Sequence, residues 1–203
     1  MVYGEYAVGS FFVGGLASYL RFDQASTRPL GAWNSVSRNS LVTTGAGGQV
    51  AAGARLAWDG WTVEPTVALA AAGFSSPGTV EQNGNGLSQQ IDGQSLTSVR
   101  GTVTLPVRRT LMLTDQRALA LRGLLGWAHE FADVSATTQA AFAAAPGVPF
   151  ATTTASISRD SLLLGLSTDF VFEDGMAFYA GWQAAIGSSS TAQTLRAGLR
   201  VTW

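Results

Sequence analysis

The sequence predicts an all-β protein, an antiparallel up-and-down barrel that crosses a membrane. Apolar and polar residues alternate over many segments, and a side-chain period of two is that of a β-strand. Only 12% of the residues are charged although 24 are glycine, which suits an outer face solvated by lipid better than one in water. Short turns and long polar loops alternate along the chain, as they do in outer-membrane barrels.

Composition excludes several other classes of protein. The 203 residues include no cysteine, so disulfide frameworks, thiolate metal sites and cysteine nucleophiles are ruled out. The net charge of −1 provides no basic surface for nucleic acid. No apolar run approaches the roughly 18 residues that a membrane helix needs. Residues 1–5 lack the basic and apolar regions of a signal peptide, so we expect the export signal to be missing from this chain.

About nine strands are expected, each long enough to cross a membrane at a tilt. The short turns are Gly9-Ser10, Asp59-Gly60 and Glu173-Asp174-Gly175, of which Asp-Gly is a hairpin signal. Pro65 falls inside the fourth strand and argues against that strand, because proline cannot donate to a sheet. The predicted strands are residues 2–8, 11–22, 41–58, 61–74, 96–107, 118–131, 156–173, 176–187 and 195–203; residues 23–40, 75–95 and 132–155 are predicted long loops, and 108–117 an intermediate connection.

The last strand gives the barrel a direction. Leu195, Ala197, Leu199, Val201 and Trp203 share one parity and form its apolar face. With Trp203 at the periplasmic interface, counting backwards places every long loop outside the cell. The first strand then starts on the outside, and bacterial barrels have even strand numbers. We therefore expect one partial barrel domain over residues 1–203, with an odd number of strands missing before it and closure incomplete.

Charged residues of the opposite parity are predicted to face the lumen. The simplest explanation is that a wet interior needs polar residues, which pair across strands. The functional explanation is a polar channel that passes or binds an extended or helical segment of the same chain. The set consists of Glu5, Arg21, Arg55, Glu64, Arg100, Arg122, Glu130, Asp169, Arg196 and Arg200.

Aromatic residues are predicted to form two girdles at the membrane interfaces. An ordinary aromatic core is the alternative explanation. The inner girdle would contain Phe12, Trp58, Trp61, Phe172, Phe178 and Trp203, and the outer girdle Phe22, Phe74, Trp127 and Phe131.

Catalysis has little support in the sequence. The one histidine, His129, has outward parity near the outer rim, where Ser156 or Ser158 could approach it as in an outer-membrane lipase. No acidic residue of matching parity is evident to orient the histidine, so we expect no enzyme activity. Metal-ligand clusters and phosphate-binding glycine loops are also missing, so no cofactor is expected.

Several motifs, in order along the chain, resemble the β-barrel translocator domain of bacterial autotransporters, the type V secretion family. They are Val2-Tyr3-Gly4-Glu5-Tyr6, Gly53-Ala54-Arg55-Leu56-Ala57-Trp58 followed by Val63-Glu64-Pro65, Ser98-Val99-Arg100-Gly101, Gly126-Trp127-Ala128-His129-Glu130-Phe131 and Ala197-Gly198-Leu199-Arg200-Val201-Thr202-Trp203. The Glu-Pro pair in this resemblance also accounts for Pro65.

The resemblance implies a twelve-stranded barrel, threaded by a helix that leads to an N-terminal passenger, of which this chain matches the last nine strands. It implies a location in the outer membrane and a part in moving the passenger to the cell surface, without nucleotide or metal. The expected partners are outer-membrane lipid, the chain's own passenger, and the barrel assembly machinery. That machinery would recognise Leu195, Ala197, Leu199, Val201 and Trp203.

Three other functions stay open at this point. A small porin or adhesin-like barrel would share the architecture, and an upstream passenger rather than a signal peptide would distinguish the translocator from it. An outer-membrane lipase would need the His129 site. A soluble β-sandwich or lipocalin-like binding module would need a buried core in place of an exposed apolar face.

Overall fold

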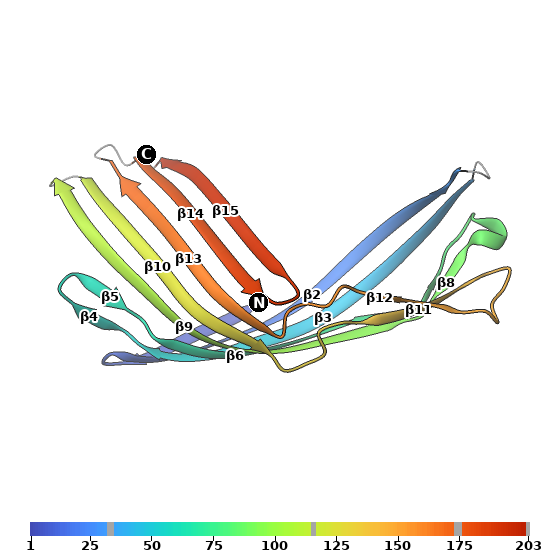
Figure 1. Cartoon of the computed structure of the whole chain (residues 1–203), viewed down its shortest axis with the longest axis horizontal. Helices are drawn as coiled ribbons and strands as arrows, with labels where there is room; N and C mark the ends of the chain where they lie inside the picture. Colours follow the sequence, from blue (N-terminus) through green and yellow to red (C-terminus); the bar gives the residue numbers. More distant parts are fainter. Residues whose placement is uncertain (32–34, 115–116, 173–175, 202–203) are drawn as a thin grey trace.

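The computed structural model describes residues 1–31, 35–114, 117–172 and 176–201, most of them in antiparallel strands. The main part of one curved eleven-stranded sheet, a half-barrel, consists of nine strands in the order β1-β2-β3-β6-β9-β10-β13-β14-β15 (Figure 1). Within the described residues β1 and β15 form its two edges. The strands are β1 Val2–Val8, β2 Phe11–Leu30, β3 Ser35–Ala54, β6 Thr66–Ser76, β9 Gln94–Thr114, β10 Arg117–Glu130, β13 Asp160–Val171, β14 Met176–Gly187 and β15 Thr191–Val201.

The prediction of nine antiparallel strands is confirmed, but the predicted ends of several strands are wrong. Residues 23–30 and 35–40 are not a loop, because β2 and β3 continue as paired strands to Leu30 and Ser35. Likewise β9 continues to Thr114 through the predicted connection. The polar residues of these extensions predicted loops. A strand that projects beyond the bilayer has water on both faces, so its sequence does not need to alternate between apolar and polar residues.

A small hairpin, β4 Leu56–Trp58 and β5 Trp61–Val63, follows β3, and β5 pairs with β9. Asp59 and Gly60 both have positive φ, 48° and 75°, as the tight hairpin predicted there requires. Pro65 lies in the gap between β5 and β6, where its carbonyl accepts a hydrogen bond from Ala54 at 3.1 Å. The sheet therefore needs no N–H at Pro65. The predicted turn at Glu173-Asp174-Gly175 lies outside the described residues.

A second, four-stranded sheet occupies much of the two other predicted long loops. Its order is β12-β11-β8-β7, from β7 Thr79–Val80, β8 Gln89–Ile91, β11 Thr137–Phe142 and β12 Phe150–Thr153, with a short 3-10 helix at Asn85–Leu87. A bridge between Arg38 and Gln82 joins the segment before β8 to β3. We call this sheet and the far ends of β2 and β3 the outer lobe, on the right in Figure 1.

A buried carboxylate holds the outer lobe together. Glu81 is 8% exposed and accepts hydrogen bonds from Arg28 Nε at 3.0 Å, Ser37 Oγ at 3.0 Å and the Gln89 amide at 2.9 Å. The Arg28 guanidinium, followed by the Gln89 amide and the Ser37 hydroxyl, holds the pKa of Glu81 below its ordinary value, although burial opposes this shift. The ion pair thus links β2 to the segment that leads into β8.

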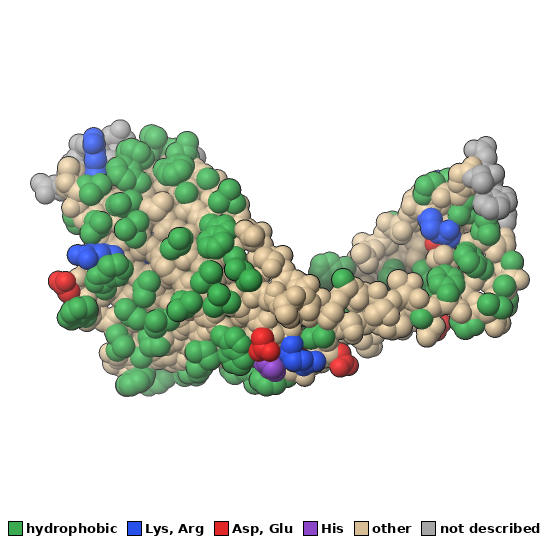
Figure 2. Space-filling view, viewed as in Figure 1, with side chains coloured by type: hydrophobic (Ala, Val, Ile, Leu, Met, Phe, Trp, Pro, Cys, Tyr) green, Lys and Arg blue, Asp and Glu red, His purple; other side chains and the backbone are tan. Residues whose placement is uncertain are grey.

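The main sheet has little hydrophobic core and a large apolar surface. Among the described residues, the buried hydrophobic side chains are mainly small alanines and include just two large ones, Phe12 and Leu30. Large apolar side chains such as Leu125, Leu166 and Leu195 are 54%, 65% and 82% exposed, and Figure 2 shows such side chains over β9–β15. A soluble sandwich would bury this surface between two sheets, so that alternative is excluded. The described residues include no helix long and apolar enough to span a membrane.

Candidate functional site

The pairing registers sort the residues of the main sheet onto two faces, since directly paired residues share a face. The polar face is continuous around the sheet. On it, Glu5 of β1 pairs with Gly14 of β2, Gly53 of β3 with Thr66 of β6, and Arg100 of β9 with Glu130 of β10. The apolar face has the opposite parity. The polar face holds Glu5, Arg55, Glu64, Arg100, Arg122, Glu130, Asp169, Arg196 and Arg200, nine of the ten charged residues predicted for the lumen.

Arg21 is the exception, and its predicted orientation is corrected here. It pairs with Thr44, so it lies on the apolar face with Tyr19, and its nearest carboxylate, Asp23, is 3.7 Å away on the same strand. Phe12 fixes the parity, because it is 9% exposed and lies under the Arg55 guanidinium on the polar face. The sequence predicted that the large apolar Phe12 faces the lipid. This prediction exchanged the two faces of β2 and put Arg21 on the polar face.

Arg55 is the centre of the first charged cluster on the polar face. Its Nη2 donates to both carboxylate oxygens of Glu5, at 2.9 and 3.0 Å, and its Nε donates to Glu64 at 3.1 Å. The guanidinium also lies 4.6 Å from the centre of the Phe12 ring, a cation–π contact. This cluster ties β1, β2 and the β4–β5 region together across the short-turn end of the sheet. It also removes Phe12 from the predicted inner girdle, and Phe22 and Phe74, which lie on the same polar face, do not belong to the predicted outer girdle.

Glu130 is the centre of the second charged cluster, at the end of β10 that lies away from the short turns. It is 3% exposed and accepts from the Ser98 hydroxyl at 2.7 Å and from the amides of Val99 and Ala132 at 2.7 and 3.1 Å. Arg100 is its cross-strand neighbour on β9. A buried carboxylate with three donors and a nearby cation is fully satisfied, so this site is structural and holds β9 to β10.

The third cluster is strongly basic. Arg108 and Arg122 are direct cross-strand partners, and Arg122 forms an ion pair with Asp169. Arg196 and Arg200 lie on β15, and with Arg122 they line a cavity of about 440 Å³ with Asp169 and Tyr179. We call Arg108, Arg122, Arg196 and Arg200 the arginine wall. Of the described carboxylates, Asp169 is the one within ion-pair distance of it. Sequence reading placed three of the four on this face but missed Arg108.

Aromatic side chains cover glycines on the polar face, a pattern that sequence reading missed. Phe12 pairs with Gly53, and Tyr179 with Gly198. A Cβ at Gly53 would come within 2.6 Å of the Phe12 ring, and a Cβ at Gly198 would collide with the Tyr179 ring. Such pairs fill the space left by a sheet glycine. To predict these pairs, one must know which residues lie opposite each other on neighbouring strands, and the order of residues along the chain does not show this.

The predicted assembly signal lies on the apolar face of the edge strand β15. Leu195, Leu199 and Val201 are 82%, 67% and 51% exposed. Ala197 has the same parity and pairs with Ala180 on β14. Trp203 lies outside the described residues.

The His129 site has the acidic partner that sequence reading did not find. His129 Nδ1 is 2.9 Å from an oxygen of Asp160, its direct cross-strand neighbour, and Trp127 Nε1 donates to the same oxygen at 3.1 Å. The expectation of no acidic partner is therefore wrong. Neither predicted serine is hydrogen-bonded to His129 in the described part of the chain: the Ser158 hydroxyl accepts from the Ser189 and Ser190 amides, both at 2.9 Å, and Ser156 donates to a neighbouring carbonyl.

The described part of the chain contains no cluster of histidine and carboxylate residues that could hold a metal ion. The site is thus a polar sheet face with three charged clusters, backed by an apolar face. Such a two-faced sheet can stand between lipid and a water-filled channel.

Comparison with known proteins agrees with this geometry. The model of the family described as autotransporter beta-domain matches residues 1–183. The chain belongs to the autotransporter beta-domain family. It is accordingly an outer-membrane translocator domain with a β-barrel fold, as the sequence predicted. The solved beta domain of the Bordetella autotransporter BrkA shares the fold, with a TM-score of 0.57 and 19% identity over 99% of this chain and 71% of that chain.

Two curated relatives are both described as extracellular serine protease from Serratia marcescens. One is 29% identical over 70% of this chain and 13% of its own length, and the other 26% identical over 100% and 19%. The chain thus spans less than a fifth of either relative.

Proposed function

We propose that this chain anchors an N-terminal passenger in the outer membrane and provides one wall of the route by which the passenger reaches the cell surface. The observation that carries the proposal is the separation of the sheet into a continuous polar face and a continuous apolar face. The apolar face contacts lipid, and the polar face contacts the exported segment and water. The arginine wall gives this route a positive side, which would attract acidic parts of the passing chain.

Charge reversal on the two faces tests the route. Arg122→Glu combined with Arg196→Glu reverses half of the arginine wall, and Arg21→Glu makes the same change on the apolar face. We expect the double variant to lower surface display of an epitope-tagged passenger severalfold while the barrel still assembles. Surface display is measured by antibody binding to intact cells, and assembly by the mobility of the unheated protein in gels. Unchanged display in the double variant would contradict the proposed route.

We propose that the barrel assembly machinery recognises the last strand through Leu195, Ala197, Leu199, Val201 and Trp203. The alternating exposed apolar residues of β15 support this. Trp203→Ala should reduce the amount of barrel assembled in the outer membrane, and Thr194→Ala, on the polar face of the same strand, serves as the control. Equal assembly of both variants would count against recognition of the aromatic end.

We also propose that the chain has no catalytic role of its own. The His129–Asp160 pair lacks a hydrogen-bonded serine among the described residues, and a nucleophile needs such a base within reach. The purified protein should therefore not hydrolyse phospholipid. Hydrolysis that His129→Ala abolishes would overturn this.

A further inference from the structure

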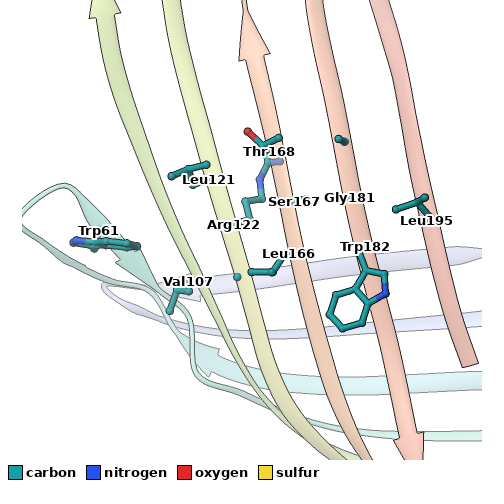
Figure 3. Close-up of a pocket in the computed structure, with 12 residues that line it drawn as sticks. Trp61, Val107, Leu121, Arg122, Leu166, Ser167, Thr168, Gly181, Trp182 and Leu195 are labelled. Atoms are coloured by element: carbon teal, nitrogen blue, oxygen red, sulfur yellow. The ribbon is translucent and has the colours of Figure 1, made fainter. Parts of the chain in front are cut away.

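An apolar groove of about 570 Å³ crosses the apolar face of the sheet at mid-strand. Figure 3 shows its walls, with Trp61 and Val107 at one end and Trp182 and Leu195 at the other. Gly123 leaves the floor open, since a Cβ there would already lie 3.0 Å from Val107. Because the apolar face is solvated by lipid, a groove of this kind can take a hydrocarbon chain.

The groove consists of two rows of residues that run across the strands. One row is entirely apolar in character: Val107, Gly123, Leu166, Trp182 and Leu195 pair in succession. The other row lies two residues along each strand from the first, nearer the short turns, and it contains polar groups. It runs through Trp61, Arg109, Leu121, Thr168 and Ala180.

Arg109 places a cation beside the groove. It is the cross-strand partner of both Trp61 and Leu121, and its guanidinium lies 5.1 Å from the centre of the Trp61 ring. No ion pair joins it to any described carboxylate. An arginine on a lipid-facing surface is costly unless it reaches the interface or an anionic group, and a phosphate is the anion that a guanidinium binds best at a membrane surface.

Thr168 adds a second polar group to the same row. Its hydroxyl oxygen is buried and has no hydrogen-bond partner, and the residue lines the groove between Leu121 and Ala180. A buried hydroxyl without a partner costs free energy. Once the side chain turns its hydroxyl toward the groove, an ester carbonyl lying there would accept its proton.

The level of this row in the membrane selects the leaflet. Trp61 follows the tight turn at Asp59-Gly60, and in outer-membrane barrels short turns lie on the periplasmic side. Gly101, which lies under the Phe131 ring, marks the other interface. The stretch of β9 from Gly101 to Arg109 has the length of one transmembrane crossing, about 9–11 residues. Arg109 therefore lies at headgroup level in the periplasmic leaflet.

We propose that this groove binds one glycerophospholipid of the periplasmic leaflet. The phosphate lies on Arg109 beside Trp61, an ester carbonyl accepts from Thr168, and an acyl chain follows the apolar row over Gly123. One cation, one donor and one apolar channel match the phosphate, an ester group and an acyl chain of a single lipid. The inference needs the membrane location of the apolar face and does not depend on passenger export.

Lipid retention tests the site. The full chain is reconstituted in nanodiscs of phosphatidylethanolamine and phosphatidylglycerol and then released into neutral detergent, and native mass spectrometry counts the phospholipids that stay bound. We expect one retained phospholipid. Arg109→Gln should lower its retention at least tenfold and Thr168→Val, which keeps the side-chain shape, severalfold. Arg21→Gln is the control, since it removes an arginine from the same face away from the groove.

Four outcomes would overturn the site. The first is equal retention in the variants and the control, and the next two are equal retention of phosphate-free diacylglycerol and preferential retention of lipopolysaccharide when each is added to the nanodiscs. A second copy of the chain in place of lipid would also overturn it. Passenger display is measured on the same variants. A variant that loses its bound phospholipid but still displays the passenger on the cell surface supports the lipid site, because passenger export does not require the bound lipid.

Discussion

Tyr179 on β14 lies directly across from Gly198 on β15, and its ring fills the space that a side chain at Gly198 would need. The same relationship holds between Phe12 and Gly53. Each pair fixes one register between neighbouring strands, since a slip of one residue would move the aromatic ring to the other face. Gly198 is therefore required for packing and not for backbone freedom.

Gly198→Val should destabilise the barrel by about 1–3 kcal/mol, the usual cost of forcing extra atoms into a filled site. Urea unfolding of the refolded protein in vesicles measures this. Gly73→Val is the matched control, because nothing lies within 4 Å of a Cβ at Gly73 in β6. Tyr179→Ala should recover part of the loss in the double variant, and independent effects of the two changes would contradict the packing argument.

Two adjacent leucines of β10 test the assignment of the faces. Leu125 is exposed on the apolar face, and Leu124 pairs with Gly165 on the polar face. Leu125→Lys should lower barrel stability by about 2–4 kcal/mol, the cost of a lysine facing the bilayer midplane. Leu124→Lys should cost much less, because its ammonium group reaches water. A larger loss in Leu124→Lys, measured by unfolding in vesicles, would show that the assignment is reversed, and similar losses in the two variants would show that no polar channel exists.

Glu130→Ala should destabilise the outer end of the β9–β10 pair. The substitution leaves the half-buried amides of Val99 and Ala132 without their acceptor, at about 1–3 kcal/mol for each group that stays unpaired. Faster hydrogen exchange at residues 98–101 would report the effect. Asp133→Ala, at an exposed acid in the loop that follows, should leave exchange there unchanged. The site is not structural if both variants exchange alike.

The outer lobe should loosen at acid pH. Because the pKa of Glu81 is lowered in the folded lobe, its ion pair with Arg28 contributes fully above the ordinary carboxyl pKa and is lost as the pH falls through the lowered value. Exchange at residues 79–91, corrected for the intrinsic pH dependence of amides, should rise between about pH 5 and pH 3.

Glu81→Gln should cost the lobe about 1–3 kcal/mol at neutral pH and remove most of this pH dependence. Asp92→Asn is the control, since the ion pair does not involve Asp92. A pH response that survives Glu81→Gln would place the titrating group elsewhere.

Local alternation in the sequence was sufficient to predict nine antiparallel strands, their order and the membrane-spanning fold. The apolar residues of β13, such as Leu162, Leu164 and Leu166, repeat every second position, because a strand between lipid and water must alternate. The tight turn at Asp59-Gly60 was equally predictable, since few residues other than glycine, asparagine and aspartate accept positive φ. These features depend on residues close together in the chain.

Features that depend on the neighbouring strand could not be read in this way. The true face of Arg21 follows from Phe12 lying under Arg55, and the partner of His129 is Asp160 on another strand. The outer lobe was also missed, because strands with water on both faces carry no alternating pattern.

The sequence by itself determined that the chain alternates as a membrane barrel does, because parity is a property of one strand. Only the tertiary structure decided which parity meets Glu5, which arginines gather in the arginine wall, and that Arg109 and Thr168 share one row beside the groove. The physical reason is register: cross-strand neighbours are set by hydrogen bonding between segments far apart in the chain.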